Sequence, residues 1–310
     1  MTLQQLIYLR EIARTGFSVS RAAKALHTSQ PNISQQMLAL ERELRLSIFV
    51  RHKGRLTGLT AVGNLILARA ESMLLDAEFI RGLGPSATAE QGVLVIATTH
   101  TQARYVIPET LSLFAKRFPK VQVTLRHGNS EQIRQAVEAG AADIGVTPDT
   151  DLPTSAIVGF ECRRYKRVVL APKGHPLARR KRCTLEDLAK YPFVTLEPAI
   201  SARRSVLQVF EAARLPVNVI LSAIDADVVK ACVERGLGLT ALVEVAYDPA
   251  RDTGIVLIET GELFPPSITS VAVNRSRHLP EYAFQFIEMF APRWTRSLVE
   301  SAMRGRATAC

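Results

Sequence analysis

The sequence has 310 residues, 47% of them hydrophobic, and a mean hydropathy of +0.09, values typical of a folded protein with two or three compact units. A net charge of +10 and an isoelectric point of about 9.8 favour a polyanionic partner. No apolar run reaches membrane-spanning length and no signal-peptide core is present, so we expect a cytoplasmic protein without a membrane partner. Four scattered cysteines without a C-x-x-C pair favour free thiols.

Residues 3–15 are predicted to form a first helix that ends at Gly16, and residues 20–44 two further helices joined by a tight turn. Ser20 and Ser29 are expected to cap these helices, because a hydroxyl there accepts a free backbone N–H group. Apolar residues recur at three- and four-residue steps on the last helix. Its opposite face carries uncharged donors and acceptors, namely Gln30, Asn32, Ser34, Gln35 and Gln36.

Amide and hydroxyl side chains read base edges when their helix lies in the major groove. A helical hairpin with a solvated polar face is the alternative interpretation. Residues 1–59 contain nine lysines and arginines and three acidic residues, which is the charge expected of a DNA-binding segment. At 46–60, two β-prone runs flank a basic turn. We expect a wing there, in which Arg51, Lys53 and Arg55 contact phosphates; an ordinary charged hairpin is the alternative.

The residues after the wing are predicted to form a long helix capped by Thr60, with a broad apolar stripe. Since an isolated helix of this length is poorly stable in water, we expect it to pair with the same helix of a second copy. Packing within its own chain is the alternative. Small polar residues at 82–92 predict a hinge. The expected domains are therefore a DNA-binding domain at 1–59, a dimerisation helix and hinge at 60–91, and a third domain at 92–310.

In the third domain predicted strands and helices alternate, which indicates an α/β fold. Ligands of such folds lie at the carboxyl ends of strands. The segment 98–105 (TTHTQARY) follows a buried strand and offers Thr99, Thr101 and Gln102 at a helix start, which suits an anion. A simple helix cap is the alternative. His100 is interpreted as structural or as a donor in the pocket wall, because no nucleophile or second base accompanies it.

Residues 163–182 hold nine lysines and arginines and no acidic residue. A solvated loop is the default interpretation of such a run, and a supplementary DNA or anion contact is the alternative. The tail after Trp294 is basic, and we expect it to fray. No G-x-S-x-G, H-E-x-x-H or P-loop motif occurs, so we expect no enzymatic activity, no catalytic residue and no bound metal or cofactor.

The N-terminal segment resembles the winged helix-turn-helix of the LysR-type transcriptional regulators. The matching motifs are L-x-x-L at 3–6, A-A at 22–23, S-Q-P-x-I-S at 29–34, L-x-x-E-L at 40–44 and F-x-R at 49–51. The resemblance implies an all-α winged helix-turn-helix followed by an α/β effector domain of the two-lobed periplasmic-binding-protein type, with lobe I at about 92–162 and 268–300 and lobe II at about 163–267. It also implies a homodimer through the long helix and a homotetramer.

At the DNA interface we expect Ser34 and Gln35 to read bases, while Gln30, Arg51 and Lys53 hold the backbone. The full set of expected DNA-contacting residues is Gln30, Pro31, Ser34, Gln35, Arg51, Lys53 and Arg55.

TTHTQARY and D-A-D-V at 225–228 resemble the CysB-like branch of this family, whose members sense sulfur status and bind sulfate between the lobes. Glu197 departs from that branch. An acid at this point would repel sulfate or select a ligand that carries an amine, such as an acetylated serine. The resemblance implies effector contacts from Thr99, Thr101, Gln102, Thr147 and Ser201, with Ser201 in place of the family's usual threonine.

We therefore expect a DNA-binding regulator of sulfur-assimilation genes that responds to a small sulfur-related anion. A LysR-type regulator of another pathway that senses a carboxylate metabolite is the alternative. An enzyme or a transport-type binding protein is the third hypothesis, and the missing catalytic motifs and export signal disfavour it.

Overall fold

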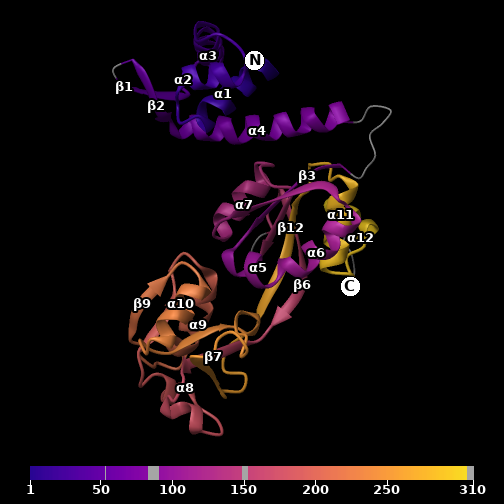
Figure 1. Ribbon diagram of the computed structural model, residues 1–310. Coiled ribbons are helices and arrows are strands. Elements are labelled where there is room, and N and C mark those ends of the chain that lie inside the picture. Colours follow the sequence, from indigo (N-terminus) through magenta and orange to yellow (C-terminus); the bar gives the residue numbers. More distant parts are fainter. Residues whose placement is uncertain (53, 83–90, 149–152, 306–310) are drawn as a thin grey trace. The chain divides into compact units, whose positions relative to one another are not determined.

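The computed structural model describes residues 1–52, 54–82, 91–148 and 153–305. The chain forms two compact units, one within residues 1–88 and the other from residue 89 onward (Figure 1). Within the described ranges, every helix is too short or too polar to cross a membrane.

The N-terminal unit packs three short helices, a two-stranded antiparallel wing and one long helix around a single core. Leu6 and Leu9 of the first helix and Ile33 and Leu40 of the third are fully buried in this core, and Ala22 of the second helix packs with them. The predicted winged helix-turn-helix is confirmed. Its elements are α1 (Leu3–Arg14), α2 (Val19–Ala25), α3 (Gln30–Leu44), β1 (Phe49–His52), β2 (Arg55–Leu59) and α4 (Ala61–Gly82).

The helix caps of this unit are the residues predicted from the sequence, with one exception. Ser29 caps α3 and Thr60 caps α4. The prediction for Ser20 is wrong, because this residue lies inside α2 and Ser18 is the cap. Gly16 has a φ of 65° and ends α1 in a left-handed turn.

Lobe I of the second unit is built on a five-stranded sheet of order β4-β3-β5-β12-β6. Strand β3 is parallel to β4 and β5, whereas β12 is antiparallel to β5 and β6. The last helices return to this lobe, and α11 packs on α6 (Figure 1). The elements are β3 (Gln91–Thr98), α5 (His100–Tyr105), α6 (Ile107–Arg117), β4 (Lys120–His127), α7 (Ser130–Glu138), β5 (Ile144–Thr147), β6 (Ile157–Tyr165), β12 (Ser267–Asn274), α11 (Glu281–Phe290) and α12 (Arg296–Met303).

Lobe II has an antiparallel sheet of order β10-β7-β11 and a parallel pair β8-β9, joined by a bridge between Phe193 and Leu239. Phe193 also packs edge-on against Phe210 in the lobe's core. The elements are β7 (Arg167–Pro172), η1 (Pro176–Arg179), α8 (Leu185–Leu188), β8 (Phe193–Leu196), α9 (Ser201–Ala212), β9 (Val219–Ala223), α10 (Ala226–Glu234), β10 (Thr240–Val243), η2 (Glu244–Ala246) and β11 (Ile255–Ile258).

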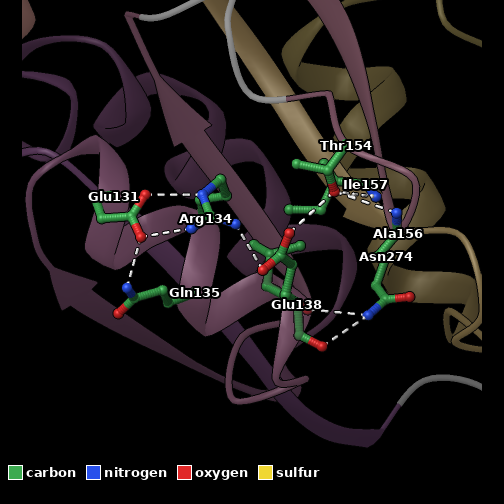
Figure 2. Close-up of polar contacts among 9 residues, drawn as sticks. Glu131, Arg134, Gln135, Glu138, Thr154, Ala156, Ile157 and Asn274 are labelled. Carbon is green, nitrogen blue, oxygen red and sulfur yellow. Dashed lines mark hydrogen bonds and ion pairs between the residues drawn. The ribbon is translucent and has the colours of Figure 1, made fainter.

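Two connections carry the chain between the lobes: β6 leads into β7, and the chain returns through β12. Figure 2 shows how α7 contacts the start of β6 and the end of β12, which are the strand ends that lie away from these crossovers. Asn274 Nδ2 donates to the Glu138 carbonyl at 3.0 Å, and Thr154 Oγ1 donates to Glu138 Oε1 at 3.0 Å. Arg134 pairs with Glu138 at 2.8 Å. The start of β6 and the end of β12 are therefore fixed to the same helix.

Candidate functional site

Part of the predicted polar face of α3 serves the structure of the N-terminal unit. Asn32 Nδ2 donates to Tyr8 Oη at 3.2 Å and to Thr28 Oγ1 at 3.0 Å. Gln36 Oε1 accepts a hydrogen bond from Gln5 Nε2 at 3.2 Å. These two polar residues of α3 therefore hold α3 against α1, and neither belongs to the expected set of DNA-contacting residues.

The remaining polar residues of α3 face outward. Gln30, Pro31 and Gln35 are exposed and Ser34 is half-buried. Gln30 Nε2 donates to Ser34 Oγ at 3.1 Å, so these two side chains are ordered together on the surface. An exposed amide and hydroxyl surface at the start of a helix is what base contacts in a major groove require.

The wing carries exposed cations at Arg51 and Arg55. Arg51 Nη2 lies 2.7 Å from Glu41 Oε2 on α3, and Glu41 Oε1 accepts the Ile48 N–H group at 2.8 Å. Glu41 thus ties the wing to the third helix and offsets part of the Arg51 charge. Lys53, predicted to contact the DNA backbone, lies outside the described residues.

A cavity of about 420 Å³ lies between the lobes of the second unit. Lobe I contributes residues of α5 and of the turn between β4 and α7. Lobe II contributes residues of the loop between β8 and α9, the turn between β9 and α10, and strand β10. The volume is in the range of small-molecule sites, about 300–1,000 Å³.

Residues expected at the effector site meet at this cavity. Thr99, Thr101, Gln102 and Ser201 all line it. Thr147 does not appear among the lining residues; it is fully buried at the end of β5, and its Oγ1 has no hydrogen-bond partner among the described residues. Ser201 is the first residue of α9, which puts a lobe II helix start opposite the lobe I segment.

Local contacts orient the lobe I side of the cavity. The hydroxyl of Thr99 caps α5 by accepting the Gln102 N–H group at 3.4 Å. Gln102 is 2% exposed, and its Nε2 donates to Thr269 Oγ1 on β12 at 2.9 Å. Its Oε1 has no partner in the described part of the chain. The amide is therefore fixed at the back of the cavity with one acceptor unused.

Three charged residues that sequence reasoning did not assign as ligands also line the cavity: Arg167, Glu197 and Asp225. Arg167 is only 7% exposed, and its Nε donates to the Pro265 carbonyl at 3.1 Å. The interpretation of the basic run as a solvated loop is wrong at Arg167, because this residue begins a buried strand. In the sequence around Arg167, the apolar residues that follow it are the signal that indicates a buried strand.

A polar contact joins the two lobes beside the cavity. Arg104 Nε lies 2.7 Å from Asp227 Oδ2, and the Tyr105 hydroxyl donates to the other oxygen of Asp227. Arg104 and Tyr105 belong to α5 of lobe I, whereas Asp227 belongs to α10 of lobe II. Burial and the hydrogen bond to Asp227 raise the pKa of Tyr105. We call these three residues the lobe contact.

His100 stands in the cavity wall. Its ring centroid lies 5.8 Å from that of His127, and its Nδ1 is buried without a partner among the described residues. Atoms of His100, Asp225 and Asp227 lie within 4.8 Å of one another, a spacing that suits a cation. However, Asp225 caps α10 and Asp227 binds Arg104, so both carboxylates already have protein partners. We interpret the cluster as cavity wall and lobe contact.

Comparison with known proteins identifies the family. The helix-turn-helix model described as "Bacterial regulatory helix-turn-helix protein, lysR family" matches residues 3–64, and the LysR substrate binding domain matches residues 87–295. The transcriptional regulator SsuR of Burkholderia cenocepacia is 41% identical over 305 residues, which cover 98% of this chain and 99% of that relative. The regulator CysB of the same organism is 38% identical over 308 residues, which cover 99% of this chain and 98% of that relative.

Among solved structures, the cofactor-binding domain of the Cbl transcriptional regulator aligns with a TM-score of 0.65 at 30% identity, over 69% of this chain and 93% of that one. The predicted resemblance to the CysB-like branch is thereby confirmed. The chain belongs to the LysR family of bacterial helix-turn-helix transcriptional regulators.

Proposed function

We propose that this protein regulates transcription of sulfur-assimilation genes and that its second unit senses a small sulfur-related anion, such as sulfate or an acetylserine. One observation carries the proposal: the predicted anion ligands Thr99, Thr101, Gln102 and Ser201 line a single cavity between the lobes. Full-length similarity to SsuR and CysB supports the same class of regulated genes. No chemistry on the effector is needed for this role, so the protein is not an enzyme in this proposal.

The DNA contact in this proposal uses the N-terminal unit, with domain limits of 1–59 for the reading head and 60–91 for the linker. The exposed side chain of Gln35 and the half-buried one of Ser34 read base edges, while Arg55 and its neighbours on the wing hold phosphates. The basic charge of the chain adds a sequence-independent attraction to duplex DNA.

Helix α4 is the proposed dimer contact. Its residues Ala70 and Leu74 are buried against the three-helix core. Leu65 is 69% exposed, and Val62 and Met73 are exposed as well. Apolar side chains in this number on one helix favour burial against a second copy. We infer a homodimer through α4 that assembles into a homotetramer.

Coupling between effector and DNA follows from the position of the cavity. A ligand that touches Thr101 of lobe I and Ser201 of lobe II binds one arrangement of the lobes better than another. The difference in affinity is the free energy that biases how paired reading heads engage their sites.

A second candidate function is a LysR-type regulator that senses a carboxylate metabolite. The observation that favours it is Arg167, a nearly buried guanidinium that lines the cavity. A guanidinium forms paired hydrogen bonds with the two oxygens of a carboxylate.

A thermal-shift screen of the full-length protein distinguishes the two candidates. The panel contains sulfate, thiosulfate, adenosine phosphosulfate, acetylserines and common carboxylates. We expect a saturable rise in melting temperature with a sulfur-related anion, its loss in Thr101→Val, and unchanged DNA binding by that variant without effector. Thr253→Val, at an exposed threonine of lobe II, is the control. A response to carboxylates alone would favour the second candidate, and a normal titration of Thr101→Val would exclude this cavity.

A further inference from the structure

Two residues at the crossover between the lobes line the cavity but are not among the predicted ligands. Arg167 begins β7 and Ser267 begins β12, and both are nearly buried. Ser267 pairs in the sheet with Tyr165, which precedes Arg167 by two residues. Arg167 and Ser267 therefore lie on the two chain segments that link the lobes, the β6–β7 connection and the start of β12, whereas the predicted ligands Thr99, Thr101 and Ser201 come from helix starts.

Two polar atoms beside the crossover between the lobes have unused hydrogen-bonding capacity. Ser267 Oγ and Gln102 Oε1 are buried and have no partner among the described residues. The bond from Gln102 Nε2 to Thr269 fixes the amide here, since Thr269 follows Ser267 by two residues, or about 7 Å along the strand. Buried polar atoms without partners are unfavourable, so a ligand that supplies the partners is favoured at this place.

The side chains define the chemistry of such a ligand. Arg167 donates through Nε to Pro265, which fixes the plane of the guanidinium, and the planar fork of donors suits a carboxylate or a sulfonate. The Ser267 hydroxyl can donate to the same oxyanion. Gln102 Oε1 only accepts, so it requires an N–H or O–H group on the ligand.

The size and walls of the cavity indicate an organic ligand. Its volume of about 420 Å³ is far more than a bare inorganic oxyanion fills. Leu196, Ile200 and Val243 contribute apolar surface to the lining. A carbon skeleton that covers this surface gains burial energy that an inorganic ion cannot.

We propose that Arg167 and Ser267 form an anchoring subsite for the carboxylate or sulfonate group of an organic effector that carries a neighbouring hydrogen-bond donor. This inference rests on the proposed function, because it assigns the effector to the same cavity, and it narrows the effector class. Inorganic sulfate has no donor and no skeleton, so it leaves the crossover subsite empty even where it binds the threonines.

Calorimetric titration of the full-length protein tests the subsite with matched probes. Isethionate is compared with ethanesulfonate and lactate with propionate, so that each pair differs by one hydroxyl, and inorganic sulfate is the bare ion. We expect the hydroxylated member of at least one pair to bind about tenfold more tightly than its partner. The pair with the larger difference tells whether the sulfonate or the carboxylate is preferred.

The variants are Arg167→Lys and Ser267→Ala, with Arg179→Lys and Ser297→Ala as controls at exposed positions. Arg167→Lys should lower the affinity for the organic probes by about tenfold or more, and Ser267→Ala should lower it by about three- to tenfold, because each variant loses a charge-assisted hydrogen bond. Sulfate affinity should not change. Because the Ser267 hydroxyl has no partner in the described structure, Ser267→Ala should keep or raise the melting temperature of the free protein.

Equal affinities of the organic probes for wild type and both variants would overturn the subsite, as would binding of sulfate but of no organic probe. A lower melting temperature of free Ser267→Ala would also count against it. Failure of every probe, sulfate included, together with no response in the thermal-shift panel, would instead overturn the proposed function.

Discussion

The division of α3 into structural and base-reading residues gives the sharpest prediction for the N-terminal unit. Asn32→Ala removes two hydrogen bonds, to Tyr8 Oη at 3.2 Å and to Thr28 Oγ1 at 3.0 Å. Each contributes about 0.5–1.5 kcal/mol net, so the unit should lose about 1–3 kcal/mol of stability. For a domain of roughly 60–100 residues this corresponds to a fall of about 4–24 °C in melting temperature. Gln35→Ala, at an exposed amide, should change stability by less than about 0.5 kcal/mol.

Hydrogen exchange of the α1–α3 amides and binding-site selection measure the two effects on the full-length protein. Asn32→Ala should lower protection across the three helices and leave the preferred DNA sequence unchanged. Gln35→Ala should keep the protection and alter the preferred sequence. Gln4→Ala, at an exposed amide of α1, should do neither. An equal loss of protection in Asn32→Ala and Gln35→Ala, or a new sequence preference in a fully protected Asn32→Ala, would refute the division.

Three further predictions concern the wing, the lobe contact and helix α8. Arg55→Gln should weaken binding to cognate and scrambled duplex alike and lower the salt slope of log K by about one, and an unchanged slope in gel shifts would exclude a phosphate contact. Asp227→Asn removes the carboxylate that binds Arg104 across the lobes. Effector affinity should therefore fall, and X-ray scattering should report more open lobes. An unchanged affinity together with an unchanged scattering profile would exclude a role of the lobe contact in effector binding. The hydrogen bond from Arg180 is the largest cause that lowers the pKa of Asp187 to about 2. The ion pair should therefore persist at pH 4 and be lost as the pH falls towards 2, and an NMR titration midpoint near 4 would contradict it.

Local sequence signals explain most of the fold. Ser29 and Pro31 define the start of α3 because capping and the missing proline N–H act within one helical turn. The strand β6 was not predicted, since its sequence IVGFECRRY mixes apolar and charged residues and lacks strict alternation. Its charges are accommodated by distant parts of the chain: Arg163 stacks on the Phe290 ring at 4.8 Å. Helix α12 was also missed, because a basic tail favours fraying unless a core residue such as Val299 is buried.

The candidate site also contains some residues that local sequence predicts and others that it does not. Three of the predicted lobe I ligands, Thr99, Thr101 and Gln102, lie in one short segment, so a strand end followed by a helix start was enough to suggest them. Ser267 and Arg167 are separated by about a hundred residues of lobe II, and only the crossover topology brings them to one cavity. Asn32 could not be assigned from the pattern of α3, because its partner Tyr8 lies on another helix. No spacing in the sequence links Arg104 to Asp227.

Competition between duplexes tests the central claim most directly. The full-length protein first selects a duplex from a random pool, and gel shifts then compare this duplex with a scrambled one, with and without a ligand of the cavity. We expect the selected duplex to bind at least about a thousandfold more tightly and the ligand to change that ratio. Equal binding of both duplexes, with and without ligand, would contradict a sequence-reading head controlled by a remote cavity.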